Sequence, residues 1–210
     1  MDTNSPSTPA LRPPGRPIGR PREFEIEEAL DKAIVVFSER GYHAASISEL
    51  KEAMGLAAGS LYKAFKDKKA IFLASFDRYK QVRNALLESE IAKGENGRDK
   101  IFRMLRFYAE ASEGETGRRG CLVVGTATEL AIADADAAER VRLSHARSEA
   151  LIESLLREGQ ADGTIAAGVD PPQTAKILLC IMQGMRVMGK TGADTGHAFL
   201  VAETAMKLLD

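Results

Sequence analysis

Two short amphipathic segments separated by Gly55-Leu56-Ala57 constrain the fold of this chain more than any other feature. Ser46 and Glu49 open the first segment as a capping box, because the Ser hydroxyl can accept from a backbone N–H while the Glu carboxylate reaches back. Gly55 ends that segment, and a second short helix follows at once. Two short helices joined by a tight, glycine-opened turn predict a helix-turn-helix.

Apolar residues recur with the helical period on both sides of this turn. They are Ile26, Ala29, Leu30, Ala33, Ile34 and Phe37 in a helix that Gly41 stops, then Ile47, Leu50 and Met54, then Leu61, Tyr62 and Phe65. We expect Leu61 and Phe65 to be core, since the last helix needs an apolar face to dock. Its other face carries Gly59, Ser60, Lys63 and Lys66.

The remainder of the chain also has a helical pattern, with no alternating strand pattern and no internal repeat. The expected helices are Lys68 to about Glu90, Arg98–Glu113, Cys121–Ala131, Ala135–Gly159, Pro171–Lys190 and Gly196–Leu209. Asp134 and Asp170-Pro171 provide caps for two of them. The predicted fold class is all-α.

The net charge of −1 argues, by itself, against a nucleic-acid-binding protein. The distribution of charge does not argue against one. The segment from Arg12 to Arg22 contains arginines and no acidic residue, and lysines dominate the segment from Ala58 to Lys69. Residues 1–22 are rich in Pro, Ser, Thr, Gly and Arg and lack an apolar period. They are predicted to form a flexible basic arm.

The N-terminal region resembles the DNA-binding domain of the tetracycline-repressor family. The resemblance rests on Phe37-Ser38-Glu39-Arg40-Gly41-Tyr42, Ser46-Ile47, Gly55 to Phe65, Lys68 and Phe72. It implies a three-helix DNA-binding domain over 23–69 and a helical ligand-binding and dimerisation domain over 70–210. It further implies a homodimer that binds palindromic double-stranded DNA, commonly as a repressor, and is released by an unknown hydrophobic or electrophilic effector.

The predicted DNA contacts combine small residues at the start of the recognition helix with basic residues around it. They are Arg16, Arg20, Arg22, Ser46, Ala58, Gly59, Ser60, Tyr62, Lys63, Lys66 and Lys68. Small residues let the backbone approach base edges, whereas lysines contact phosphate and set affinity. Tyr62 is assigned to phosphate by resemblance, and the alternative for Lys63 and Lys66 is a solvated helix face. Ala57 lacks the side-chain cap of many relatives, which costs about 1 kcal/mol.

The arm contains two Gly-Arg-Pro units, which resemble the minor-groove-binding AT-hook core. Proline keeps such a segment extended, and arginine suits a narrow, electronegative groove. We expect minor-groove contact from Arg16, Arg20 and Arg22, and the alternative is a solubilising tail.

The expected dimer interface lies on the last two long helices, by resemblance. Its candidate residues are Ile177, Ile181, Met185 and Met188. The first of these helices carries more apolar surface than one chain's core covers, which fits a symmetric interface. The alternative is a purely intramolecular core for half of these positions.

Cys121 follows Arg118-Arg119-Gly120 at an expected helix start, where cations and the helix dipole lower a thiol pKa. It is therefore a candidate sensor of electrophiles or oxidants, and Gly120-Cys121-Leu122 resembles a subgroup with such a cysteine. The alternative is a buried small hydrophobe, which is also the interpretation of Cys180. Two cysteines without CxxC spacing predict neither a disulfide framework nor a metal site.

Two other functional classes compete with a regulator. An enzyme built on Cys121 and His145 has no support from spacing, because His43, His145 and His197 lack any partner for metal or base chemistry. An architectural DNA-binding protein would bind without sequence preference. We expect no cofactor, and the sequence shows neither a signal-peptide pattern nor a membrane-spanning segment. It therefore predicts a cytoplasmic regulator rather than an enzyme.

Overall fold

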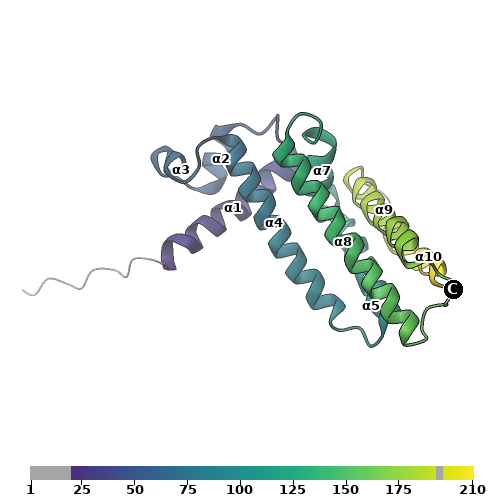
Figure 1. The fold of residues 1–210 in the computed structure, drawn as a ribbon. Coiled ribbons are helices and arrows are strands. Elements are labelled where there is room, and N and C mark those ends of the chain that lie inside the picture. The colour runs from purple at the N-terminus through teal and green to yellow at the C-terminus, as the bar shows by residue number, and fades with distance from the viewer. Residues whose placement is uncertain (1–19, 193–195) are drawn as a thin grey trace, which may run out of the picture.

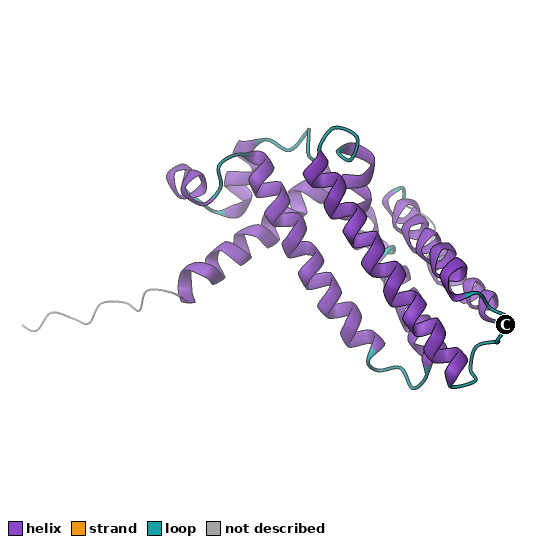
Figure 2. Ribbon diagram, in the orientation of Figure 1, coloured by secondary structure: helices purple, strands orange, loops and turns teal. Residues whose placement is uncertain are grey.

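The computed structural model describes residues 20–192 and 196–210, and this part of the chain folds into helices joined by loops, without strands (Figure 2). The helices are α1 (Arg20–Arg40), α2 (Ile47–Met54), α3 (Ala58–Ala64), α4 (Lys68–Ile91), α5 (Gly97–Ala111), α6 (Gly114–Arg119), α7 (Leu122–Glu129), α8 (Ala135–Ala161), α9 (Pro171–Lys190) and α10 (His197–Ala205), followed by the 3-10 helix η1 (Met206–Leu209). The all-α prediction is confirmed. None of these helices combines the length and the apolar character needed to cross a membrane.

The long helix α4 connects the two ends of the molecule (Figure 1). The short helices α2 and α3 gather with α1 at one end of it, and α9 and α10 lie on the opposite side of the fold. Helix α8 packs along both α5 and α9, which places the long helices side by side.

Several predicted boundaries are corrected. Helix α1 begins at Arg20, so Arg20 and Arg22 belong to its first turn rather than to an arm ending at residue 22, whereas Arg16 lies outside the described residues. Helix α7 begins at Leu122 with Cys121 as its N-cap and ends at Glu129, not at residue 131. The short α6 was missed, because its sequence GETGRR has no apolar period.

The buried apolar residues form two clusters. One joins Phe37 and Leu61 of the helix-turn-helix region to Phe76 of α4, Val123 of α7 and Val141 of α8. The other fills the space between α5, α8, α9 and α10. The first cluster therefore crosses residue 69, the predicted end of the DNA-binding domain.

Helices α6 and α9 approach the end of α5 at two glycines. A Cβ atom on Gly117 would lie 2.2 Å from the carbonyl oxygen of Ser112, and one on Gly189 would lie 2.3 Å from it. Real carbon and oxygen atoms do not approach so closely, so only glycine permits this packing.

Candidate DNA-binding surface and effector cavity

The helix-turn-helix has the predicted caps. The Ser46 hydroxyl accepts from the Glu49 N–H at 3.1 Å, and the Glu49 carboxylate accepts from the Ser46 N–H at 2.9 Å. Gly55 adopts a φ of 67°, in the left-handed region that ends a helix without strain. Both features confirm the predicted capping box and turn.

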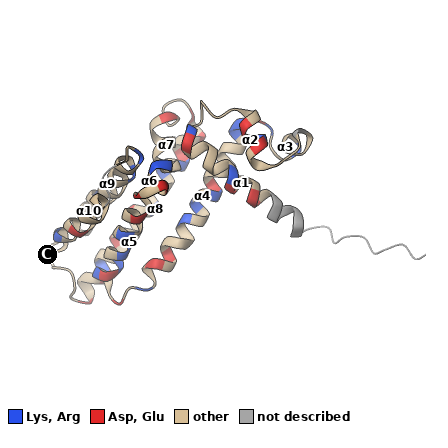
Figure 3. Ribbon diagram, turned by 180° about the vertical axis from the view of Figure 1, so that it is seen from behind, with Lys and Arg blue, Asp and Glu red and all other residues tan. Residues whose placement is uncertain are grey.

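Helix α3 presents a polar face that carries no acid. Leu61 is buried in the core, as predicted, whereas Tyr62 is 58% exposed and Lys63 and Lys66 point to solvent. Elsewhere charges of both signs alternate, as along α4 and α5 in Figure 3. Ala57 caps α3 without a side-chain hydrogen bond, as expected. An uncapped helix start leaves backbone N–H groups available to an anion such as phosphate.

Lys68 has a different role from the predicted phosphate contact. Its ammonium donates to the carbonyl oxygens of Tyr42 at 2.9 Å and Ala45 at 3.0 Å, and it lies 4.5 Å above the centre of the Tyr42 ring. These contacts hold the turn between α1 and α2 against the start of α4. The assignment of Lys68 to DNA is corrected to a structural one, because its donors are already engaged.

A carboxylate at the end of α7 binds the same turn from the other side. Glu129 accepts hydrogen bonds from the backbone N–H groups of Tyr42 at 2.8 Å and His43 at 2.6 Å. Gly41 has a φ of 81°, at which a side chain is strained, and a Cβ there would lie 2.6 Å from this carboxylate and displace it. The Lys190 ammonium adds a bond to the carbonyl of Ser38 at 2.8 Å. Sequence reasoning missed Glu129, whose partners lie more than eighty positions away.

A small interior cavity of about 20 Å³ lies where five helices converge. Its lining residues are Tyr79, Lys80 and Arg83 of α4, Tyr108 of α5, Cys121 and Val123 at the start of α7, Ser144 of α8, and Gln183 and Arg186 of α9. Such a volume holds about one water molecule. The lining includes three cationic side chains and no carboxylate.

Arg186 is the most buried of these cations, with 3% of its surface exposed. Its Nη2 donates to the carbonyl of Gly120 at 2.7 Å, but Nε and Nη1 have no partner within the described part of the chain. Gln183 Oε1 in the same lining is also unpaired among these residues. Buried charges without partners are costly, so this position is expected to serve a bound group.

Cys121 lies beside this arginine. Burial alone would raise the pKa of its thiol, but the Arg186 charge, the Tyr79 hydroxyl 3.5 Å from Sγ and the Val124 and Val123 N–H groups together lower it. Burial, and next the Cys121 charge, raise the pKa of Tyr79, which therefore stays a donor. The predicted lowering of the Cys121 pKa is confirmed, but the charge that lowers it most is that of Arg186 in α9. Arg119 instead pairs with Glu39 and Glu115.

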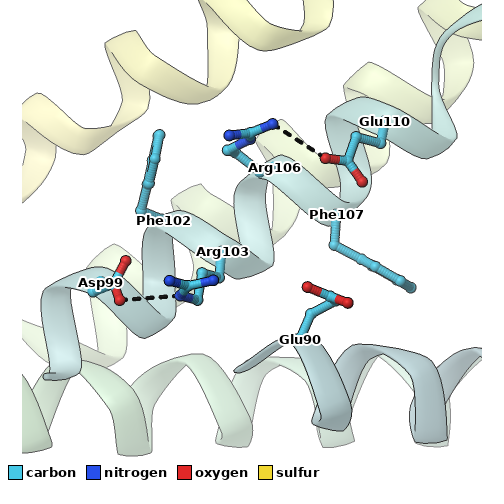
Figure 4. Close-up of a pocket in the computed structure, with 7 residues that line it drawn as sticks. All are labelled: Glu90, Asp99, Phe102, Arg103, Arg106, Phe107 and Glu110. Atoms are coloured by element: carbon cyan, nitrogen blue, oxygen red, sulfur yellow. Dashed lines mark hydrogen bonds and ion pairs between the residues drawn. The ribbon is translucent and has the colours of Figure 1, made fainter. Parts of the chain in front are cut away.

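The described part of the chain also contains hollows that are larger than this cavity. A groove of about 460 Å³ runs between the α1–α2 turn, α7 and the end of α9, and it is lined by Cys121, Arg186 and Glu129. The second hollow lies on α5 (Figure 4), where Arg103 pairs with Asp99 and Arg106 with Glu110. Because its charges are neutralised within the hollow, this second site attracts a charged ligand less than the interior cavity does.

The outer surface of α9 is apolar. Ile177 and Met188 are each 47% exposed, Ile181 is half-buried, and Cys180 is exposed on the same side. Leu200 of the adjacent α10 is 64% exposed. Met185 is corrected from an interface candidate to a core residue, because it is 3% exposed and packs against α5 and α10.

Known proteins match both halves of the chain. Residues 29–75 match "Bacterial regulatory proteins, tetR family", and residues 97–204 match "Tetracyclin repressor-like, C-terminal domain". The HTH-type transcriptional repressor ComR of Escherichia coli is 31% identical over 193 residues, which are 90% of this chain and 91% of ComR. The transcriptional regulator AcuR of Cereibacter sphaeroides is 28% identical over 92% of this chain and 90% of AcuR.

A solved structure extends the match to three dimensions. The regulator CifR, a cysteine mutant complexed with 26bp operator DNA, has a TM-score of 0.74 and 29% identity, covering 93% of this chain and 100% of CifR. No match distinguishes the subgroup with a Gly-Cys-Leu motif, which stays a prediction. The agreement of helix-turn-helix, helical C-terminal half and sequence shows that the chain belongs to the tetracycline-repressor (TetR) family of transcriptional regulators.

Proposed function

We propose that this protein is a homodimeric repressor that binds a palindromic operator and leaves it when a small molecule occupies the C-terminal half. The observation that carries the proposal is the exposed, acid-free face of α3 in a chain that is similar over 90% of its length to a named repressor. The operator complex of CifR supports the DNA-binding part of the proposal. Because its target is DNA, we expect the protein to act in the cytoplasm, and we propose no catalysis.

The DNA-binding surface combines α3 with its neighbours. Gly59 and Ser60 lie at the start of α3, where side chains are small enough for the helix to approach base edges in the major groove. Lys63 and Lys66 provide phosphate contacts, and the exposed Tyr62 adds a donor. Arg16, which precedes α1, is proposed to reach the adjacent minor groove, with Arg20 and Arg22 following it from the first turn of α1.

Dimerisation is proposed through α9 and α10, which would leave α3 of each protomer free for DNA. Exposed residues at positions 177, 180, 184, 187 and 188, with the half-buried Ile181, follow the helical period along one face of α9. Repetition of this face across a two-fold axis would bury it. Two recognition helices related by that axis would fit half-sites about one helical turn apart.

Helix α7 is the proposed route from effector to DNA. It begins beside Cys121 and the interior cavity and ends at Glu129, which holds the α1–α2 turn. An effector that moves the start of α7, or α4 beside it, would change the position of the helix-turn-helix. Differential affinity for the two arrangements would then release DNA.

The first test is selection of bound sequences from random duplex DNA, with Lys63→Ala beside the natural protein. Lys207→Ala, an exposed lysine at the far end of the chain, is the matched control. A palindromic consensus that Lys63→Ala weakens and Lys207→Ala preserves is the expected result. Failure to enrich any sequence at low salt would overturn the repressor proposal, and binding without sequence preference would favour the architectural alternative.

A further inference from the structure

The interior cavity has a charge imbalance that the repressor function alone does not explain. Lys80, Arg83 and Arg186 all face it, and within the described residues none of them pairs with a carboxylate. Arg83 instead stacks over the Phe107 ring at 4.1 Å. Burial, with smaller contributions from Arg147 and Arg83, lowers the pKa of the Lys80 ammonium despite the opposing effect of Cys121. Lys80 and Arg83 are half-buried, and Lys80 also lines an outer hollow with Asp77 and Glu88, so Arg186 is the cation that is both buried and incompletely paired. Such a charge favours an anion.

The Cys121 thiolate supplies at most one negative charge against three cations. It lies at the edge of the cavity, held by the Tyr79 hydroxyl, and does not bond to the free Nε and Nη1 of Arg186. These two donors, with the Ser144 hydroxyl in the same lining, remain for a second group, whereas the Tyr108 hydroxyl is engaged with Ser148. Even a fully ionised Cys121 would therefore leave the site incompletely neutralised.

We infer that this cavity binds a small organic anion through a carboxylate head, with Arg186 as its anchor. A planar guanidinium matches a planar carboxylate in charge and geometry, and the tyrosine rings and Val123 provide an apolar wall for a short tail. The inference rests on the proposed repressor function, for which it names the chemical class of effector.

The size of the cavity connects this ligand to the switch. At about 20 Å³ it holds a water molecule but no carboxylate with a carbon tail. Binding must therefore separate α4, α7 and α9, which supply most of the lining. Through Lys68 and Glu129, α4 and α7 also contact the α1–α2 turn, and Lys190 at the end of α9 contacts Ser38 of α1. A ligand that fits only an opened cavity has the differential affinity that release requires.

The experiment is titration calorimetry of the DNA-free protein with propanoate, propanamide and inorganic phosphate at constant ionic strength. Propanoate should bind saturably, whereas propanamide, which has nearly the same shape without the charge, should not. Arg186→Gln should weaken propanoate binding about tenfold or more. Arg142→Gln, which alters an exposed arginine paired with Glu139, should leave it unchanged.

Two further variants keep the test decisive. If Arg186→Gln does not fold, Arg83→Gln replaces it, with several-fold weaker propanoate binding expected. Cys121→Ser should bind propanoate at least as tightly as the natural protein, because the competing thiolate is gone. Loss of binding in Cys121→Ser would overturn Arg186 as the anchor.

The same preparation is tested in parallel for binding to the selected operator. Operator binding without any response to propanoate would overturn the inference and leave the repressor proposal standing. Phosphate binding in place of propanoate would overturn the carboxylate assignment. Propanoate binding by a protein that binds no operator would support the cavity and overturn the repressor.

Discussion

Glu129 at the end of α7 accepts a hydrogen bond from the backbone N–H of Tyr42, with 2.8 Å between Oε2 and the nitrogen. The second oxygen accepts from His43, so one carboxylate joins the sensing half to the α1–α2 turn. No other side chain in the described residues bonds to both of these N–H groups. The contact gives the proposed transmission through α7 a residue at which it can be tested.

We propose that alkylation of Cys121, at the start of α7, also releases the operator, and Glu129→Ala should retain operator binding and lose much of that release. Hydrogen bonds to a charged group contribute about 1.5–3 kcal/mol. The factor by which N-ethylmaleimide lowers operator affinity should therefore become about tenfold smaller or more. Operator affinity is measured before and after alkylation in a Cys180→Ser background. Glu139→Ala, at a surface carboxylate paired with Arg142, is the control. Full release by the Glu129 variant would contradict the route through α7.

Lys63→Ala should weaken operator binding at all sequences and reduce its dependence on salt. Each lost phosphate contact lowers the slope of log affinity against log salt by about 0.9. Binding titrations at several salt concentrations give this slope directly. An unchanged slope would return Lys63 to the solvated-face alternative.

Lys68→Met should instead destabilise the fold. Its ammonium bonds to the carbonyls of Tyr42 and Ala45, and methionine keeps the apolar stem while removing those donors. We expect the free energy of unfolding to fall by about 1.5–3 kcal/mol, measured by urea denaturation. Lys66→Met, on the exposed face beside it, should leave stability nearly unchanged. Equal stability of the two variants would contradict the structural role of Lys68.

The pH dependence of Cys121 alkylation should report its lowered pKa. A free thiol, with a pKa of about 8.5, loses reactivity as the pH falls below that value. Because the pKa of Cys121 lies lower, its thiolate and its iodoacetamide reaction persist to lower pH. Rates are measured in Cys180→Ser, and Arg186→Gln should move the profile toward higher pH. If the protein that retains Arg186 showed the pH profile of a free thiol, the lowered pKa of Cys121 would be contradicted.

Gly189→Ala should destabilise the protein, because its Cβ would lie 2.3 Å from the backbone oxygen of Ser112. Relief requires movement of α9 against α5, at a cost of about 1–3 kcal/mol. Gly125→Ala has nothing within 4 Å of the added carbon and should be neutral or slightly stabilising in its helix. Thermal or urea unfolding of both variants makes the comparison. Equal stability of the two variants would show that α9 can move away from α5 at Gly189 without cost.

Local signals explain why much of the fold could be predicted. Some residues cap the helix end at which they lie, as Ser46, Gly55 and Asp170-Pro171 do. The neighbouring sequence is therefore enough to predict those helix ends. Helix α6 was missed because its six residues carry no apolar stripe and its N-cap, Glu113, makes no side-chain capping bond.

The site was less predictable, because its interactions join distant segments. The pKa of Cys121 is lowered by Arg186, sixty-five positions away, rather than by the neighbouring Arg118 and Arg119. Lys68 matches the basic pattern of a DNA contact, yet the turn that engages it lies more than twenty positions earlier. Met185 and Met188 are both apolar, and only the packing of the folded chain buries Met185 and leaves Met188 exposed.

The apolar cluster that joins Phe37 and Leu61 to Val123 and Val141 makes the N-terminal region dependent on the rest of the chain. A DNA-binding fragment that ends at residue 69 would lose the partners that cover Phe37, so it should not keep its fold when moved to another protein. The two halves should melt together as one cooperative unit. Chimeras that exchange operator specificity will therefore need their junctions chosen around α7 and the start of α8, and not at the boundary suggested by the helix-turn-helix alone.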